Sequence, residues 1–328
     1  MIGWLRTGVP LVLTLIFALP LTVIARNRTI RGEPMVILIL NMTIILFLFN
    51  FTSFALSAID VQYGYDMPQL LCGMLMLIGV NIFGGFKVST FFLALEQYIA
   101  VVFSLRHFTI MSRWVKRMVA LTWFYIGTLT VVGLVCHHLE LETVAEFDIR
   151  VLGIGHEIQK CGWQMIPNAF MVAFQACFLL FSMLTCAILL YTAYQGFKHE
   201  KRIAKGDVSH QTRRFMMRFK SFKRIVKLLV IFLLIDIIGT GIHIASRWFT
   251  LPPVFLNVTH LARVLSLIVE YWAYGASNTI IRRAVRLFFG FRPTPEESEI
   301  APWAPERTPQ IAPSDQLVVA DLEAASDN

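Results

Sequence analysis

Charged residues are scarce along most of this chain. They make up 15% of its 328 residues, whereas hydrophobic residues make up 56%. A water-soluble domain of this size needs far more charge to cover its surface. The shortage of charge therefore argues against a soluble protein, and no polar segment is long enough to perform separate chemistry. We accordingly do not expect an enzyme.

Seven apolar runs occupy the places where charge is missing. A helix of about 20 apolar residues, rising about 1.5 Å per residue, crosses the roughly 30 Å hydrocarbon core of a bilayer. The runs cover residues 8–25, 35–59, 70–104, 115–136, 165–194, 222–247 and 254–276. They predict an all-α membrane protein, a seven-transmembrane-helix bundle. We interpret the first run as a signal anchor, because too many spans follow it for a removable signal peptide. In the third run, Gly84-Gly85 predicts close helix packing or a kink.

Basic residues gather in alternate loops, and this pattern predicts the orientation. Lys and Arg in short loops stay on the cytoplasmic side of a membrane. They are concentrated in residues 26–34, 105–117 and 195–227, whereas acidic residues dominate residues 60–69 and 137–164. We therefore expect the N-terminus outside and the C-terminus in the cytoplasm. The net charge of +8 comes largely from basic residues in these loops. Basic residues at the membrane surface suit anionic lipids, so they do not indicate nucleic acid as a partner.

Cysteine is also rare, and its five residues fall into two groups. Cys136, Cys177 and Cys186 lie inside apolar runs, where a cysteine usually behaves as a small buried hydrophobe. Cys72 and Cys161 fall on the expected outer side, where disulfides form. We predict a Cys72–Cys161 disulfide that ties the long outer loop to the bundle.

The third run ends in a motif, Glu96-Gln97-Tyr98, that is followed by Ser104-Leu105-Arg106-His107. With the expected spans and the spacing from Cys72 to Glu96, this arrangement resembles the rhodopsin-like (class A) G-protein-coupled receptors, in particular the fish-type odorant receptors. The resemblance covers residues 8–290. Further matching positions are Glu33-Pro34-Met35 before the second run, Trp123 in the fourth, and Tyr274-Gly275 in the seventh.

The resemblance implies a plasma-membrane chemosensory receptor that binds a small molecule and signals through a heterotrimeric G protein, without a cofactor. It implies roles in G-protein coupling or activation for five residues: Glu96, Gln97, Tyr98, Arg224 and Tyr274. Since glutamine has no charge, Glu96 could pair with another cation, for example Arg106 or Arg224.

The sequence departs from the family pattern at several positions, including Phe17-Ala18, where the family has a first-helix asparagine, and Ser104, where it has proline. Gln97 stands where the family has arginine, so the ionic latch and planar fork of that arginine are missing. The second-helix aspartate of the family falls on Leu46, which cannot ligate sodium, and its seventh-helix Asn-Pro pair falls on Glu270-Tyr271. An alternative is therefore a receptor-like protein that binds a ligand but does not couple conventionally.

Three ionisable residues lie at similar depths in the third, sixth and seventh runs: Lys87, Asp236 and Glu270. Charged side chains at membrane depth are costly unless they are paired. We expect a buried charge cluster with a structural role rather than a ligand contact. The same residues could form the ion relay of a seven-helix transporter, but such proteins usually contain internal repeats, and this sequence has none.

The expected ligand site lies in the outer half of the bundle. The resemblance places Arg263 facing the cavity, with His260 one turn above it and His243 in the outer part of the sixth run. An arginine there suits a carboxylate, sulfate or phosphate group, which favours an anionic ligand. Alternatively, Arg263 pairs with an acid of the outer loop such as Glu140 or Glu157. Three residues at helical spacing offer an apolar wall: Met76, Val80 and Phe83.

The C-terminal part of the chain changes character after the seventh run. Residues 277–290 show an amphipathic pattern that predicts a short helix on the membrane surface. From residue 291 to 328 the chain loses periodicity and is rich in Pro, Glu, Asp, Ser and Ala. These residues predict a disordered cytoplasmic tail after a receptor domain at 1–290. We expect no metal site.

Overall fold

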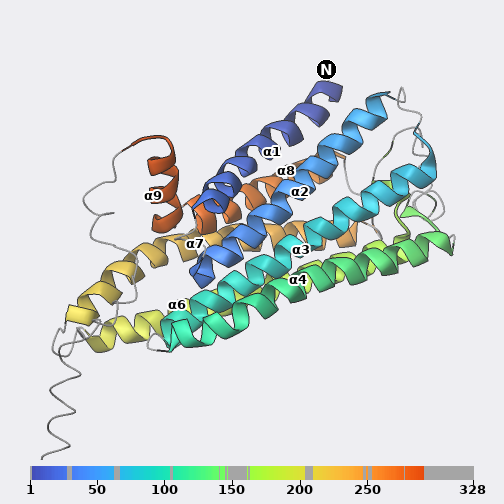
Figure 1. The fold of residues 1–328 in the computed structure, drawn as a ribbon. Helices are drawn as coiled ribbons and strands as arrows, with labels where there is room; N and C mark the ends of the chain where they lie inside the picture. The colour runs from blue at the N-terminus through green and yellow to red at the C-terminus, as the bar shows by residue number, and fades with distance from the viewer. Residues whose placement is uncertain are drawn as a thin grey trace, which may run out of the picture. The chain divides into compact units, whose positions relative to one another are not determined.

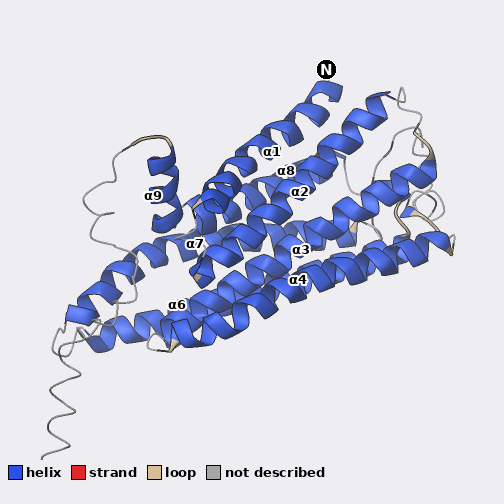
Figure 2. Ribbon diagram, in the orientation of Figure 1, coloured by secondary structure: helices blue, strands red, loops and turns tan. Residues whose placement is uncertain are grey.

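The computed structural model describes residues 2–27, 32–62, 67–103, 106–139, 141–144, 146, 161, 163–203, 210–246, 249, 253–276 and 278–291. The chain divides into two compact units, Met1–Arg282 and Arg283–Asn328. Helices dominate the described part of the chain (Figure 2). The only β feature of these described residues is an isolated bridge between Thr143 and Pro167. This agrees with the predicted all-α class.

Long helices follow one another along the first unit (Figure 1). They are α1 (Ile2–Arg26), α2 (Pro34–Gln62), α3 (Gln69–Val102), α4 (His107–His138), α6 (Asn168–Ile203), α7 (His210–Ala245) and α8 (Pro253–Tyr271). The short helix η2 (Trp163–Met165) precedes α6, and the π-helical turn η3 (Trp272–Ala276) continues α8. Several helices are longer than the predicted runs. The largest extensions lie at the start of α4, the end of α6 and the start of α7, where the helix continues through polar residues beyond the apolar stretch.

Six of the described helices are long and apolar enough to cross a membrane. The crossing segments are Thr7–Arg26, Pro34–Gln62, Leu70–Val102, His107–His138, Asn168–Lys198 and Val226–Ala245. The first unit is therefore a helical bundle of the multi-pass membrane type. Among the described residues α8 is helical but is not one of these six, so the seventh predicted span is not confirmed.

Helix α3 lies at the centre of the packing. It packs on α2, α4 and α6, while the other main pairs are α1 on α2, α6 on α7 and α7 on α8. In its most apolar stretch 61% of the residues are buried, against 17% for α4. Small residues allow this close packing: a Cβ added at Gly84 would lie 2.7 Å from Cε2 of Phe174 in α6.

The predicted disulfide is present. Cys72 in the first turn of α3 is bonded to Cys161, a short distance before α6. Both cysteines are buried and belong to a cluster with Leu56 and Met67. We call this end of α3 the disulfide end and the opposite end, where Glu96 lies, the Glu96 end.

The helix α9 (Thr279–Phe288) follows η3 within the predicted amphipathic segment. Asn278 caps it, because its Oδ1 accepts hydrogen bonds from the backbone N–H groups of Ile280 (2.9 Å) and Ile281 (3.4 Å). The predicted disordered tail lies outside the described residues from residue 292 onward.

Candidate functional site

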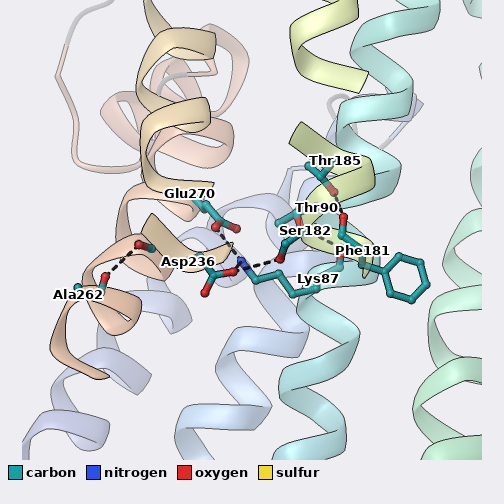
Figure 3. Close-up of polar contacts among 9 residues, drawn as sticks. Lys87, Thr90, Phe181, Ser182, Thr185, Asp236, Ala262 and Glu270 are labelled. Carbon is teal, nitrogen blue, oxygen red and sulfur yellow. Dashed lines mark hydrogen bonds and ion pairs between the residues drawn. The ribbon is translucent and has the colours of Figure 1, made fainter. Parts of the chain in front are cut away.

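The structure brings Lys87, Asp236 and Glu270 together from three helices (Figure 3). The Lys87 Nζ of α3 lies 2.7 Å from Oε1 of Glu270 in α8 and 3.0 Å from Oδ2 of Asp236 in α7. Each of the three side chains is 1% exposed. Since these residues are far apart in the sequence, the ion pairs join the centre of the bundle to its last helices. We call these three residues the Lys87 cluster.

A fourth helix supports the Lys87 cluster through hydrogen bonding and aromatic contact. The Ser182 hydroxyl of α6 donates to Asp236 Oδ2 at 3.1 Å (Figure 3). The Lys87 ammonium lies 5.1 Å from the ring centroid of Phe178, also on α6, and 5.5 Å from that of Phe86. Aromatic faces attract cations and exclude water. Helices α3, α6, α7 and α8 therefore converge on one ammonium group.

Buried ion pairs of this kind hold helices in one arrangement. Removing one partner of a buried pair leaves an uncompensated charge, which typically costs about 3–5 kcal/mol. A helix movement that separates α8 or α7 from α3 would have the same effect on Lys87. Among the described residues no group of three or more His, Cys, Asp or Glu side chains could hold a metal ion. The arrangement therefore offers an ionic lock between helices.

At the other end of α3, Glu96 has a histidine partner. Its Oε1 lies 2.9 Å from Nε2 of His107, the first residue of α4, and the Glu96 side chain is 3% exposed. Arg106, one of the two suggested examples of a partner, is exposed, and it follows Phe103 in a turn that precedes His107. The side chain of Arg224, the other suggested partner, lies outside the described residues.

The two residues after Glu96 lie in different surroundings. Gln97 is 8% exposed, and its Oε1 has no hydrogen-bond partner. The Tyr98 ring packs against those of Tyr191 in α6 (5.8 Å between centroids) and Phe103 (6.3 Å). The Gln97 side chain is therefore buried, and it supplies no charge for an ion pair with Glu96.

Tyr274 is a buried phenol four residues after Glu270. It lies in η3, and its side chain is 1% exposed with a hydroxyl that has no hydrogen-bond partner. A π-helical turn at such a point is a frequent feature of functional sites.

The residues predicted to form the ligand site are only partly described. Met76, Val80 and Phe83 pack against a buried cluster that contains Phe170, Phe174 and Phe178 of α6. The Phe83 and Phe178 rings are stacked, with centroids 5.1 Å apart. His243 lies in the last turn of α7 and is partly buried. The side chains of His260 and Arg263 lie outside the described residues, so the anion site stays a prediction.

Sequence reasoning missed a polar network between α2, α3 and α4. The Trp123 indole N–H donates to Asn41 Oδ1 at 2.9 Å, and the Asn41 amide donates to Ser89 Oγ at 3.0 Å. All three helices are apolar, so the presence of a polar residue inside an apolar run was the feature of the sequence that could have revealed the network. The same signal marks Asn81 and Gln175, which are buried with amide atoms that have no hydrogen-bond partner.

The candidate site thus has two parts along α3. One is the Lys87 cluster in the interior, and the other is Glu96-Gln97-Tyr98 at the end of the helix. The described residues of the predicted ligand site are the apolar side chains on α3, which pack on α6, and His243 of α7. No protein-family model and no curated protein matches this chain.

Proposed function

We propose that this chain is a seven-helix receptor similar to the rhodopsin-like G-protein-coupled receptors, and in particular to the fish-type odorant receptors. It binds a small molecule near the disulfide end and signals through a heterotrimeric G protein at the Glu96 end. The observation that carries the proposal is the pair of features at opposite ends of α3. These are the Cys72–Cys161 disulfide and the Glu96-Gln97-Tyr98 motif.

The distribution of basic residues supports a plasma-membrane protein with the Glu96 end in the cytoplasm. Arg113, Lys116 and Arg117 are exposed in the first turns of α4, next to the Glu96 end. Lys201 is exposed in the last turn of α6. Basic residues at one end of the helices favour the cytoplasmic side, which puts the N-terminus and the disulfide outside.

The Lys87 cluster supplies the element that a ligand would bias. A ligand between α3, α6, α7 and α8 near the disulfide end changes the relative positions of these helices, and all four meet at Lys87. Packed interfaces of this kind change between discrete arrangements rather than deforming continuously. At the Glu96 end, the Glu96–His107 pair takes the place of the arginine latch in the resting state.

The ligand itself is a small molecule, and an anion suits the predicted cation at Arg263. The rings and aliphatic chains of Met76, Val80 and Phe83 favour an apolar body next to that charge. A panel of small carboxylates, sulfates and phosphates with apolar tails, together with neutral analogues of the same shape, tests this preference. Equal responses to the charged and neutral sets would contradict an anionic ligand.

The test of coupling does not require a known ligand. The purified full-length chain in lipid nanodiscs is mixed with each class of heterotrimeric G protein, and basal nucleotide exchange is measured beside that of Gln97→Arg. We expect exchange above the rate of the G protein alone with the wild type. Lys116→Met, an exposed residue of α4, serves as a matched surface control. Failure of both the wild type and Gln97→Arg with every class would contradict a G-protein-coupled receptor.

A second candidate is a receptor-like protein that binds a ligand but does not couple. The uncharged Gln97, whose Oε1 has no hydrogen-bond partner, favours it, as do Leu46 and Tyr271 at positions where the family has polar or helix-breaking residues. Exchange that occurs only with Gln97→Arg supports this candidate. Robust exchange with the wild type removes it.

A further inference from the structure

The Lys87 cluster contains one ammonium group and two carboxyl groups. Lys87 Nζ lies within 3.0 Å of Asp236 and within 2.7 Å of Glu270, and all three side chains are 1% exposed. In a medium of low dielectric constant an ionised carboxylate is costly unless it is paired and hydrogen-bonded. One ammonium group can balance the charge of one carboxylate, so the second carboxyl group of the cluster is costly in its ionised form.

The two carboxyl groups have unequal hydrogen bonding. Asp236 Oδ2 accepts from the Ser182 hydroxyl at 3.1 Å in addition to pairing with Lys87. The difference lies in the oxygen next to Lys87, because Glu270 Oε1 accepts from Lys87 and from no second donor among the described residues. The buried Oε2 of Glu270 has no hydrogen-bond partner. Hydrogen bonds from donors favour the charged form of a carboxyl group. Asp236 is therefore the better site for the negative charge, and Glu270 the better site for a neutral carboxylic acid.

Among the described residues, charged and titratable groups lie near Glu270 on α3, α7 and η3. Helix α3 contributes the Lys87 ammonium, α7 contributes the Asp236 carboxylate, and η3 contributes the Tyr274 phenol. From α1 the apolar ring of Phe17 packs edge-on against the neighbouring Tyr271 at 4.6 Å. Among these described groups Lys87 is the only cation, and Asp236 repels a negative charge on Glu270.

A metal cation does not suit this position. Lys87 already occupies the space between the two carboxyl groups, so a second cation would lie against an ammonium group. The described residues also hold no group of His, Cys, Asp or Glu side chains arranged for a metal. A proton needs no such coordination shell, and it neutralises Glu270 at the oxygen that has no donor.

We propose that the Lys87 cluster is a proton-binding site, in which Glu270 takes up one proton from the solvent and is a neutral carboxylic acid in this arrangement of the helices. Lys87 then balances the charge of Asp236. Release of the proton gives Glu270 of α8 a negative charge, so that the cluster then contains two carboxylates. The repulsion between Glu270 and Asp236 of α7 loosens the contact between these two helices. The proposal goes beyond receptor function, because it requires neither a ligand nor a G protein.

Infrared spectroscopy tests the proposal directly. The purified full-length chain in lipid nanodiscs at neutral pH should show the C=O stretching band of a protonated carboxyl group, which shifts in D₂O. Glu270→Gln removes this band. Asp236→Asn also removes it, because Glu270 then has Lys87 to itself and ionises. Glu146→Gln, at an exposed acid, leaves the band unchanged.

Several outcomes would overturn the proposal. These are a wild-type spectrum without the band, a band retained in Glu270→Gln, and a band that appears only when sodium is replaced by a bulky organic cation. The last outcome would mean that sodium, not a proton, occupies the site. A spectrum in which Asp236→Asn keeps the band at full intensity would contradict the assignment of the charge to Asp236.

A second measurement applies if the variants do not fold. The folded wild type holds a proton that the unfolded chain releases at neutral pH, so raising the pH favours unfolding. We expect the melting temperature of the wild type to fall between mildly acidic and mildly alkaline buffer. A melting temperature that is constant or rises over this range would overturn the proposal. These readouts are independent of signalling, so failure of the proposed receptor function would leave them unchanged.

Discussion

Lys87 would be one of the most expensive residues in this chain if it stood alone in hydrocarbon. Its ammonium group is instead surrounded by two carboxyl groups and two aromatic rings from α3, α6, α7 and α8. The cost of an isolated charge made Lys87, Asp236 and Glu270 recognisable in the sequence. The contribution of Ser182 was not recognisable, because a serine in an apolar helix is unremarkable until its partner is known.

Replacing Lys87 by methionine should destabilise the bundle. The substitution keeps the length of the side chain but leaves Asp236 and Glu270 facing each other without a cation. We expect a loss of about 3–5 kcal/mol, measured as a lower melting temperature in detergent and a smaller fraction of protein at the cell surface. Lys116→Met, exposed on α4, is the matched control and should change neither quantity. A Lys87→Met protein as stable as the control would show that the cluster does not hold the helices together.

Asn41 joins α2 to two neighbouring helices through its side chain. It accepts a hydrogen bond from Trp123 of α4 and donates one to Ser89 of α3. Asn50, on the same helix and also buried, donates only to the carbonyl of Leu46 in its own helix. Substituting each asparagine in turn therefore compares hydrogen bonds between helices with a hydrogen bond within one helix.

Asn41→Ala should cost about 1–3 kcal/mol, because it leaves the Trp123 indole N–H buried without an acceptor. Asn50→Ala should cost less, since the carbonyl of Leu46 remains available to the helix backbone. Chemical or thermal unfolding in detergent compares the two. Equal losses would mean that the network between α2, α3 and α4 contributes no more than a bond within one helix.

The helices themselves follow from local pattern, whereas their closeness follows from small residues. The pair Gly84-Gly85 was visible in the sequence as a packing site. In the structure Gly84 packs against Phe174 of α6, whereas Gly85 packs against Ile126 of α4. Helices α4, α6 and α7 were predicted too short. Apolar composition identifies only the part of a helix that lies in the membrane, and polar helical turns beyond that part leave no hydropathy signal. The helical state of these turns depends on backbone hydrogen bonds that continue from the apolar part.

Gly84→Ala should be destabilising. A Cβ at this position would lie 2.7 Å from Phe174 Cε2, so the ring must move, and overpacking of this kind costs about 1–3 kcal/mol. Gly127→Ala in α4 is the control, because nothing lies within 4 Å of its added Cβ. We expect it to be neutral or to gain up to about 1 kcal/mol from helix propensity. The measurement is the melting temperature of each purified variant, and destabilisation by Gly127→Ala alone would contradict the packing of α3 on α6.

The bundle as a whole is joined by contacts between distant parts of the chain. The disulfide links residues separated by 89 positions. Near it, backbone hydrogen bonds from Val144 to Ile166 and from Asn168 to Glu142 hold the segment before α6. Cysteine positions and expected orientation were enough to predict the disulfide, whereas these hydrogen bonds could not be read from the sequence.

Cys72→Ser should lower the stability of the whole molecule. Removing a native disulfide typically costs about 2–5 kcal/mol, more for long loops, because the unfolded chain regains conformational freedom. A reducing agent should lower the melting temperature of the wild type and leave that of Cys72→Ser unchanged. Cys177→Ser, at a free cysteine, is the control and should respond to reduction as the wild type does. A wild type insensitive to complete reduction would contradict this role of the disulfide.

Composition and hydropathy were sufficient to establish that the chain forms long apolar helices in a membrane protein, because these are properties of neighbouring residues. They also marked the residues too costly to leave unpaired, and the cysteines placed to bond. Tertiary structure alone decided the partners: His107 rather than Arg106 for Glu96, Ser182 for Asp236, and Trp123 for Asn41. A partner depends on the rotation and closeness of whole helices, which bring together residues as far apart as Lys87 and Glu270, 183 positions along the chain.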